Sequence, residues 1–310
     1  LKGETLPVPC HRAVVDYVSA TCQDESEEDE NKDGAGMPAR IGICSATGRK
    51  GPLARLMKAT KILGQTYRAA LVAVQKSSGY DSYGKEQLFN ASLGKETVEA
   101  CTIALKALLD KDSRNRFGFG PLTVLFWVEK AVSSFDFEAA LPLLAQKNKE
   151  NAMNNTTPML KMCEAVHKGA LPPEDRKIRY YFLGLAPNAA RIMVRFWKTG
   201  TVGELAENIA QHFDDLRIIG RDKDFALVSL LSVLVHENKM DNVPPNLPEQ
   251  MLAAILDGRP YPMTILNLCL QRIHAGREKK ESGKGKGPLV SPLRAAILKA
   301  YLNRKERNSC

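Results

Sequence analysis

The chain has 310 residues, enough to bury a sizeable core, and 44 lysines and arginines against 35 aspartates and glutamates give it a formal net charge of +9. That basic excess fits a polyanionic partner. No apolar run approaches the roughly 20 residues that a membrane span needs. The seven cysteines lie far apart without a C-x-x-C pair, which argues against the usual zinc and redox motifs and fits reduced thiols in a cytoplasmic protein.

In chain order, residues 6–22 could form a short helix. The acidic block that follows (DESEEDENKD) predicts a disordered, solvated loop over 24–36. The apolar run Ala69–Val74 predicts a strand. Helical spacing of apolar residues predicts a helix over Lys95–Leu109, and the short run Leu122–Trp127 after Gly-Pro predicts a buried strand. Two further helices are expected, over Phe137–Lys147 and Pro158–Lys168.

The strongest local signal lies between Ile178 and Lys198. Ile178–Leu185 is rich in aromatic residues, Arg191–Trp197 alternates, and Ala186–Ala190 between them has Pro-Asn turn chemistry. This pattern predicts an antiparallel hairpin. Strict alternation would put two sets of side chains on opposite faces, Ile192, Val194 and Phe196 on one, and Arg191, Met193, Arg195 and Trp197 on the other.

Helical signals dominate after the hairpin. Thr201 and Glu204 form a capping box, and further helices are expected over Phe225–His236, from Pro248 to Gly258, and from the Ser291-Pro292 cap onward. The basic, Gly-rich run Arg277–Lys286 predicts a mobile linker. The sequence therefore predicts an α+β fold, with a mixed or antiparallel sheet in a domain over 1–199 and a helical segment over 200–310.

Catalytic and cofactor motifs are missing from this sequence. It has no G-x-S-x-G elbow, no H-E-x-x-H pair and no phosphate-binding loop of the G-x-x-x-x-G-K-[ST] type, and its five histidines lie in different elements. The residues thus predict neither a metal site nor a cofactor, and favour a non-catalytic protein.

Nucleic-acid contacts are the more specific hypothesis. Arg191 and Arg195 on one strand face, roughly 13 Å apart, could form a platform for a sugar-phosphate backbone. They could equally pair with carboxylates on a covering helix, and the pattern alone does not choose between these two readings. The loop Tyr80–Gln87, with two tyrosines and Lys85, suits a backbone clamp or a stacked base, although an exposed turn would show the same residues.

Three segments of the sequence resemble a known family. Asp81–Gln87 with Asn90-Ala91 resembles a "SYGKEQ…NAP" stretch, Tyr181–Trp197 resembles "YFLGLSPNAARISVRFW", and Ile255–Pro262 with Arg294–Arg304 resembles "ILTGRPYP…RAALIKAYLNR". All three are similar to the large subunit of the type I-C CRISPR Cascade. Departures, such as Ile43–Gly48 in place of "CLVTG", indicate a divergent member. The family's own N- and C-terminal regions would lie outside this chain.

The resemblance implies a non-catalytic subunit of an RNA-guided complex. Its expected partners are the guide RNA, the target double-stranded DNA, the backbone and small subunits of Cascade, and a recruited helicase-nuclease, with no membrane. We expect this subunit to help recognise the motif that flanks the target and to stabilise the opened duplex. The expected nucleic-acid contacts are Lys85, Arg191 and Arg195, with Asn188 shaping the hairpin turn and Arg55 and Lys198 as weaker candidates.

Two other classes of function remain open from the sequence. A metal-dependent nuclease or guide-RNA-processing enzyme of the same defence system would need a carboxylate or histidine set that the sequence does not show. An assembly scaffold that touches only protein would keep its arginine face covered by a partner.

Overall fold

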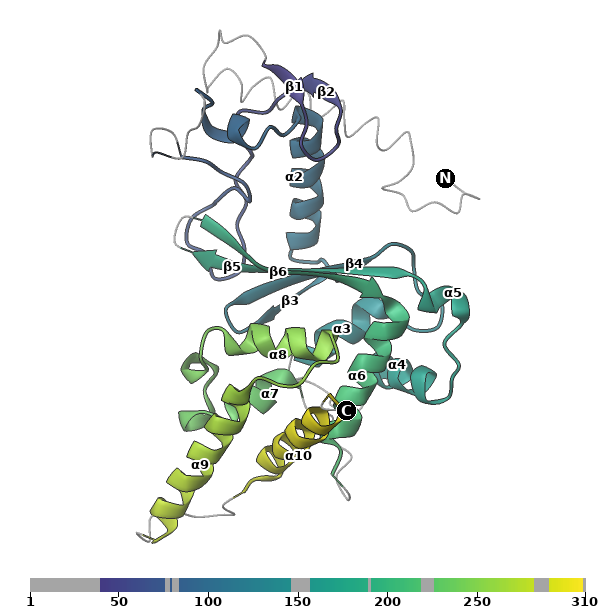
Figure 1. Ribbon diagram of the computed structural model, residues 1–310, viewed down its shortest axis with the longest axis vertical. Helices are drawn as coiled ribbons and strands as arrows, with labels where there is room; N and C mark the ends of the chain where they lie inside the picture. Colours follow the sequence, from purple (N-terminus) through teal and green to yellow (C-terminus); the bar gives the residue numbers. More distant parts are fainter. Residues whose placement is uncertain are drawn as a thin grey trace. The chain divides into compact units, whose positions relative to one another are not determined.

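The computed structural model describes residues 40–75, 79, 84–145, 157–188, 191–218, 226–281 and 290–308 (Figure 1). The predicted helix over 6–22 and the acidic loop over 24–36 lie outside these residues. The chain forms two compact units. Unit 1 comprises the chain up to Lys58 together with Ala70–Lys106, and unit 2 comprises Ala59–Ala69 and the chain from Ala107 onward. The chain therefore passes from one unit to the other three times.

Unit 1 is built around a helix and a small hairpin. Strands β1 (Ile41–Ile43) and β2 (Lys50–Pro52) pair antiparallel, followed by the 3-10 turn η2 (Gln87–Asn90) and helix α2 (Lys95–Leu109). The prediction of α2 is confirmed. The predicted strand over Ala69–Val74 is wrong, because only Ala69 forms a bridge, to Thr60, and the apolar residues that follow pack irregularly against the small core of unit 1. That core consists of Ala54, Met57, Leu88 and Val98.

Unit 2 contains a four-stranded antiparallel sheet in the order β3-β4-β5-β6. The strands are β3 (Arg116–Phe119), β4 (Leu122–Val128), β5 (Arg179–Asn188) and β6 (Arg191–Thr201). The predicted strand over 122–127 and the predicted hairpin are both confirmed. β5 runs through Pro187, whose missing N–H is tolerated because β4 pairs with β5 only as far as Leu185.

A β-bulge interrupts the pairing of β5 with β6. Gly184 pairs with Phe196 whereas Leu185 pairs with Val194, which leaves Arg195 as the extra residue. The alternation in β6 therefore shifts at this point, and the prediction that Trp197 shares a face with Arg195 is wrong. Gly184 makes room for the bulge, because a Cβ there would overlap the ring of Phe196.

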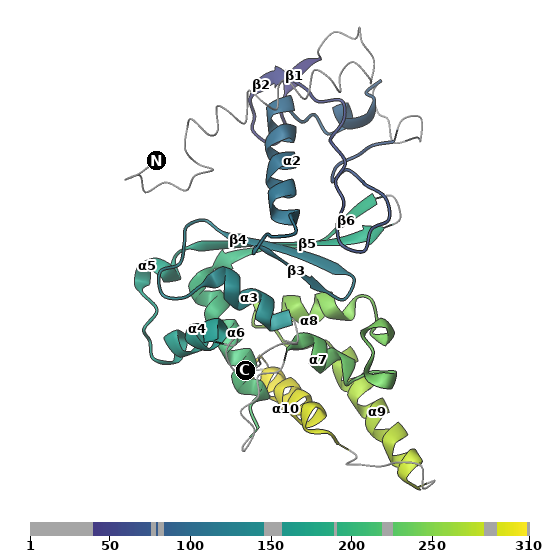
Figure 2. The same cartoon turned by 180° about the vertical axis from the view of Figure 1, so that it is seen from behind.

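The described helices of unit 2 gather on one face of its sheet (Figure 2). After β4 come α3 (Phe137–Ala145), α4 (Thr157–His167) and α5 (Pro173–Arg176). After β6 come α6 (Val202–Leu216), α7 (Leu227–Ser232), two 3-10 turns, η3 (His236–Asn238) and η4 (Met240–Asn242), then α8 (Leu247–Leu256), α9 (Met263–Glu281) and α10 (Pro292–Arg307).

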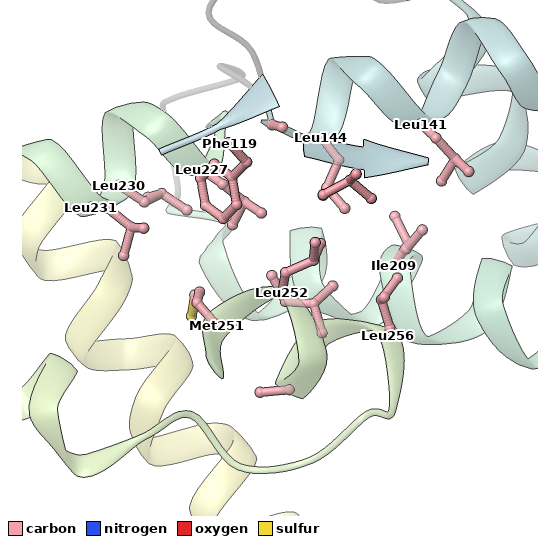
Figure 3. Close-up of a cluster of buried hydrophobic side chains, with 14 of the residues drawn as sticks. Phe119, Leu141, Leu144, Ile209, Leu227, Leu230, Leu231, Met251, Leu252 and Leu256 are labelled. Carbon is pink, nitrogen blue, oxygen red and sulfur yellow. The ribbon is translucent and has the colours of Figure 1, made fainter. Parts of the chain in front are cut away.

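The sheet and these helices share one hydrophobic core. Phe119 of β3, Leu144 of α3, Ile209 of α6 and Leu252 of α8 are each no more than 1% exposed and converge there (Figure 3). The α+β class is confirmed, with an antiparallel sheet. The sequence-based boundary at residue 199 falls inside β6 of unit 2, a strand that packs into the same core as the helices that follow it.

Local capping signals place most helix ends correctly. Thr201 and Glu204 form both bonds of the capping box of α6, Ser291 caps α10, and Gly258 follows α8 with a φ of +66°. The helix expected over Phe225–His236 is shorter than predicted. The predicted linker over Arg277–Lys286 is helical up to Glu281, where α9 ends, and residues 282–286 lie outside the described residues. None of the described helices has the length and apolarity needed to cross a membrane.

Candidate nucleic-acid interface

Three aromatic rings meet on the sheet face opposite the helices of unit 2. Trp127 of β4 and Tyr181 of β5 are cross-strand partners, and their rings stack with centroids 5.5 Å apart and planes 19° apart. The ring of Trp197 of β6 lies 5.6 Å from that of Trp127 and 5.8 Å from that of Tyr181. We call these three residues the aromatic cluster.

The alternation of the strands holds the aromatic cluster outward. The neighbours Phe126, Phe182 and Phe196 point to the opposite face and are buried in the core. Trp197 remains 51% exposed. Rings fixed on a rigid sheet with a free face can stack on unpaired bases, and such stacking contributes about 1 to 3 kcal/mol per base.

Arg179 lies two residues before Tyr181 on β5, so it projects from the same face of the sheet. Its side chain is exposed and has no ion pair among the described residues. Glu129 is its backbone neighbour, donating its N–H to the carbonyl oxygen of Arg179 at 2.9 Å. The charge beside the aromatic cluster is therefore mixed rather than uniformly basic.

The predicted contacts Arg195 and Lys198 lie on the helical side of the sheet, along α8. Arg195 pairs with Glu249 at 2.7 Å and also donates to Asn246, and Lys198 pairs with Asp257 at 2.6 Å. All four charged side chains are about one quarter exposed. Arg195 and Lys198 are therefore paired with carboxylates of a covering helix, which is one of the two alternatives that the sequence left open for the strand's cations.

Arg191 and Asn188 are cross-strand partners at the turn end of the hairpin. Both side chains are exposed, and neither has a described hydrogen bond or ion pair. The segment Ala59–Ala69 fixes the backbone here, because Gln65 donates from Nε2 to the carbonyl oxygen of Arg191 at 3.2 Å. Of the three cations predicted on β6, Arg191 is the one whose guanidinium is unpaired.

Lys85 and Arg55 lie in unit 1, and each is hydrogen-bonded to residues of the turn η2. Arg55 donates from Nε to Oε1 of Gln87 at 2.8 Å, and its carbonyl oxygen accepts from the N–H of Leu88 at 3.0 Å. Asn90 donates to the carbonyl oxygen of Lys85 at 3.1 Å. Residues 80–83 of the predicted clamp loop lie outside the described residues.

Metal-ligating side chains do not cluster in the described part of the chain. No group of three or more histidine, cysteine, aspartate or glutamate side chains there could hold a metal ion. His212 is buried beside Tyr261, with its Nδ1 2.5 Å from the tyrosine hydroxyl. Burial, and then the charge of Arg304, lower the pKa of His212 well below its ordinary value, so this imidazole stays neutral and away from solvent.

A family model described as "CRISPR-associated protein (Cas_Csd1)" matches residues 1–310. The chain belongs to this family. No curated protein matches it. Membership in Cas_Csd1 confirms the CRISPR association that the sequence resemblance predicted.

The fold separates the predicted contacts of this Cas_Csd1 protein into three places. Lys85 and Arg55 are bound to η2 in unit 1, Arg191 and Asn188 lie at the turn of the hairpin, and Arg195 and Lys198 lie along α8. Sequence reasoning missed Trp127 and Tyr181, since their contact depends on the register of strands more than 50 residues apart. The sequence did contain a signal for them. Trp127 follows Phe126 and Tyr181 follows Tyr180, and because side chains alternate along a strand, one aromatic ring of each adjacent pair has to face away from the core.

Proposed function

We propose that this chain is the non-catalytic large subunit of a type I-C Cascade complex, binding guide RNA and target DNA. It would help recognise the flanking motif and stabilise the opened duplex for a recruited helicase-nuclease, together with the backbone and small subunits. The family membership and the sequence resemblance support the complex, and the net charge of +9 supports a polyanionic partner.

The aromatic cluster is the observation that carries the proposal. Opening a duplex produces unstacked bases, and an exposed set of rings on a rigid sheet offers them a new stacking surface. Trp197 supplies the most accessible ring, and Arg179 and Arg191 supply unpaired guanidinium groups on unit 2. Arg195 and Lys198 contribute less to this proposal because α8 already neutralises them.

Intrinsic fluorescence tests the proposal without a label. The chain has two tryptophans, Trp127 and Trp197, and both belong to the aromatic cluster. Titration of the purified chain with single-stranded DNA should quench their emission, because bases stack on the indoles. Trp197→Ala should weaken binding about 5- to 150-fold, the equivalent of one lost stacking contact.

Tyr67→Ala is the matched control, since Tyr67 is 69% exposed and lies outside the aromatic cluster. It should leave affinity unchanged. Unquenched fluorescence together with equal affinities for all three proteins would contradict a stacking role. Cleavage of the oligonucleotide in Mg²⁺ or Mn²⁺ would contradict the non-catalytic assignment.

A further inference from the structure

Two arginines lie where α9 packs against α10, and neither has an ion pair among the described residues. Arg272 lies on α9 and Arg294 in the first turn of α10, and the two helices lie side by side (Figure 1). Cys269, one turn before Arg272, donates from its thiol to the carbonyl oxygen of Arg294 at 3.9 Å. This contact fixes the level at which the two helices meet.

The hydrogen bonds of these arginines are incomplete. Arg294 donates from Nε to the carbonyl oxygen of Val233 at 3.1 Å. The Nε of Arg272 is buried and has no hydrogen-bond partner. An unpaired buried donor of a charged group is costly, so such a group in a native structure needs an explanation, and a bound ion is one of them.

The electrostatics of the site are one-sided. Burial, and then the charge of Arg272, lower the pKa of Arg294, which is the expected effect of a like charge at short range. The first turn of α10 carries no acidic residue, so the positive end of that helix adds to the same field. Neither arginine has an ion pair among the described residues.

We propose that Arg272 and Arg294 form a binding site for a phosphate group, occupied by a phosphodiester of the bound nucleic acid. The identity of the occupant rests on the proposed function. Two guanidinium groups match the oxygens of one phosphate, and both side chains are partly exposed, so the group can approach from solvent.

The site is separate from the aromatic cluster. The cluster lies on the sheet face opposite the helices, whereas Arg272 and Arg294 belong to helices on the other side of the same unit. The two can therefore be tested independently.

Arg272→Met is the decisive variant, because methionine keeps an apolar stem and removes both the charge and the unpaired N–H. Binding of single-stranded DNA should be measured by anisotropy of a labelled oligonucleotide between 50 and 200 mM salt. Loss of one phosphate contact should reduce the slope of log K against log salt by about 0.7 to 0.9. The double variant with Arg294→Gln should lose no more than this, because both arginines serve one phosphate.

Arg114→Met is the control, since it removes the same charge from an exposed arginine that is paired with Asp136 at 2.5 Å. Its slope should match that of the wild type. Equal salt slopes for Arg272→Met and the wild type would overturn the nucleic acid as the occupant. Equal reductions of the slope in Arg272→Met and Arg114→Met would show a non-specific charge effect and would overturn the site.

A second measurement tests the site without nucleic acid. In chloride buffer, Arg272→Met should melt at the same temperature as the wild type or higher, because it relieves a like-charge contact. Inorganic phosphate at equal ionic strength should raise the melting temperature of the wild type more than that of the variant. A lower melting temperature for Arg272→Met, with no phosphate effect on the wild type, would mean that Arg272 is structural and would overturn the site.

The two measurements also separate the possible sources of phosphate. A phosphate-dependent shift with an unchanged salt slope would identify a free phosphate as the occupant and reject the nucleic acid. If the chain binds no nucleic acid at all, the proposed function fails, while the phosphate-dependent shift still decides whether the anion site exists.

Discussion

Asp175 is a buried carboxylate that joins α5 to the loop between β4 and α3. It is 4% exposed, and its Oδ2 accepts from the N–H and hydroxyl groups of both Ser133 and Ser134 at 2.7 to 3.1 Å. Asp175→Ala should lower the free energy of unfolding by about 2 kcal/mol or more, because buried donors lose their acceptor. Urea denaturation measures this. Asp136→Asn is the control: Asp136 is 46% exposed in its pair with Arg114, and its loss should cost less than about 1 kcal/mol.

The same carboxylate should make stability depend on pH. Burial raises the pKa of Asp175, but the four donors outweigh it and hold the pKa below the ordinary value of 3.8. A lowered pKa in the folded state stabilises the fold fully above the unfolded-state value and loses that contribution as pH falls through the folded-state pKa. The difference in unfolding free energy between wild type and Asp175→Asn should therefore be constant from pH 5 to 7 and shrink below pH 4. A difference that grows on acidification would contradict this account.

The ion pair with Glu249 determines whether the guanidinium of Arg195 is available to bind nucleic acid. If the pair is structural, Glu249→Gln leaves a quarter-exposed guanidinium without a carboxylate partner and lowers the unfolding free energy by about 1 kcal/mol. If α8 holds Arg195 away from nucleic acid, the same variant should also increase affinity for single-stranded DNA, since a competing carboxylate is gone. We expect the stability loss and at most a small gain in affinity. A tenfold gain would return Arg195 to the nucleic-acid contacts.

At the level of elements, α10 is fastened to its neighbours by a buried cation. Arg304 is 1% exposed, donates to Asp215 of α6 at 3.2 Å and to the carbonyl oxygens of Ala254 and Arg259 at 3.0 Å, and lies 4.7 Å from the ring of Tyr261. Arg304→Met should destabilise the protein by about 3 to 5 kcal/mol, because Asp215 and two carbonyl groups lose a buried donor. Chemical denaturation of the intact chain gives the value.

Arg307→Gln provides the comparison for this element. Arg307 binds the same carboxylate at 2.7 Å, but its side chain is 43% exposed, so its loss should cost about 1 kcal/mol. Equal destabilisation by the two substitutions would mean that burial does not set the strength of this contact.

The elements show where local sequence was sufficient and where it was not. Caps and periodicity predicted α2, α6, α8 and α10, because their signals lie within one or two turns. The faces of β6 could not be predicted in the same way. They depend on a bulge at Arg195 that a strictly alternating pattern does not record, and the prediction therefore put Arg195 on the same face as Trp197.

At the scale of the whole molecule, the sequence could not show which segments share a core. Composition changes near residue 199, where strands give way to helices, and this change suggested a domain boundary. In the folded chain, β5, β6 and the later helices bury their apolar residues against one another, and Ala59–Ala69 joins unit 2 from far upstream. Contacts over such sequence separations are set by packing of the complete unit, which no local pattern records.

This organisation makes a direct prediction for fragments. A fragment over 200–310 would expose residues such as Leu205, Ile209 and Leu252, each no more than 1% exposed in the complete chain, because their partners on the sheet are missing. It should unfold without a cooperative transition in urea. A fragment over 107–310 keeps the sheet with its helices and should unfold cooperatively, at lower stability than the full chain because it lacks Ala59–Ala69. If the 200–310 fragment instead unfolded cooperatively, and its circular dichroism showed the helix content that this segment has in the full chain, residue 199 would be a real domain boundary.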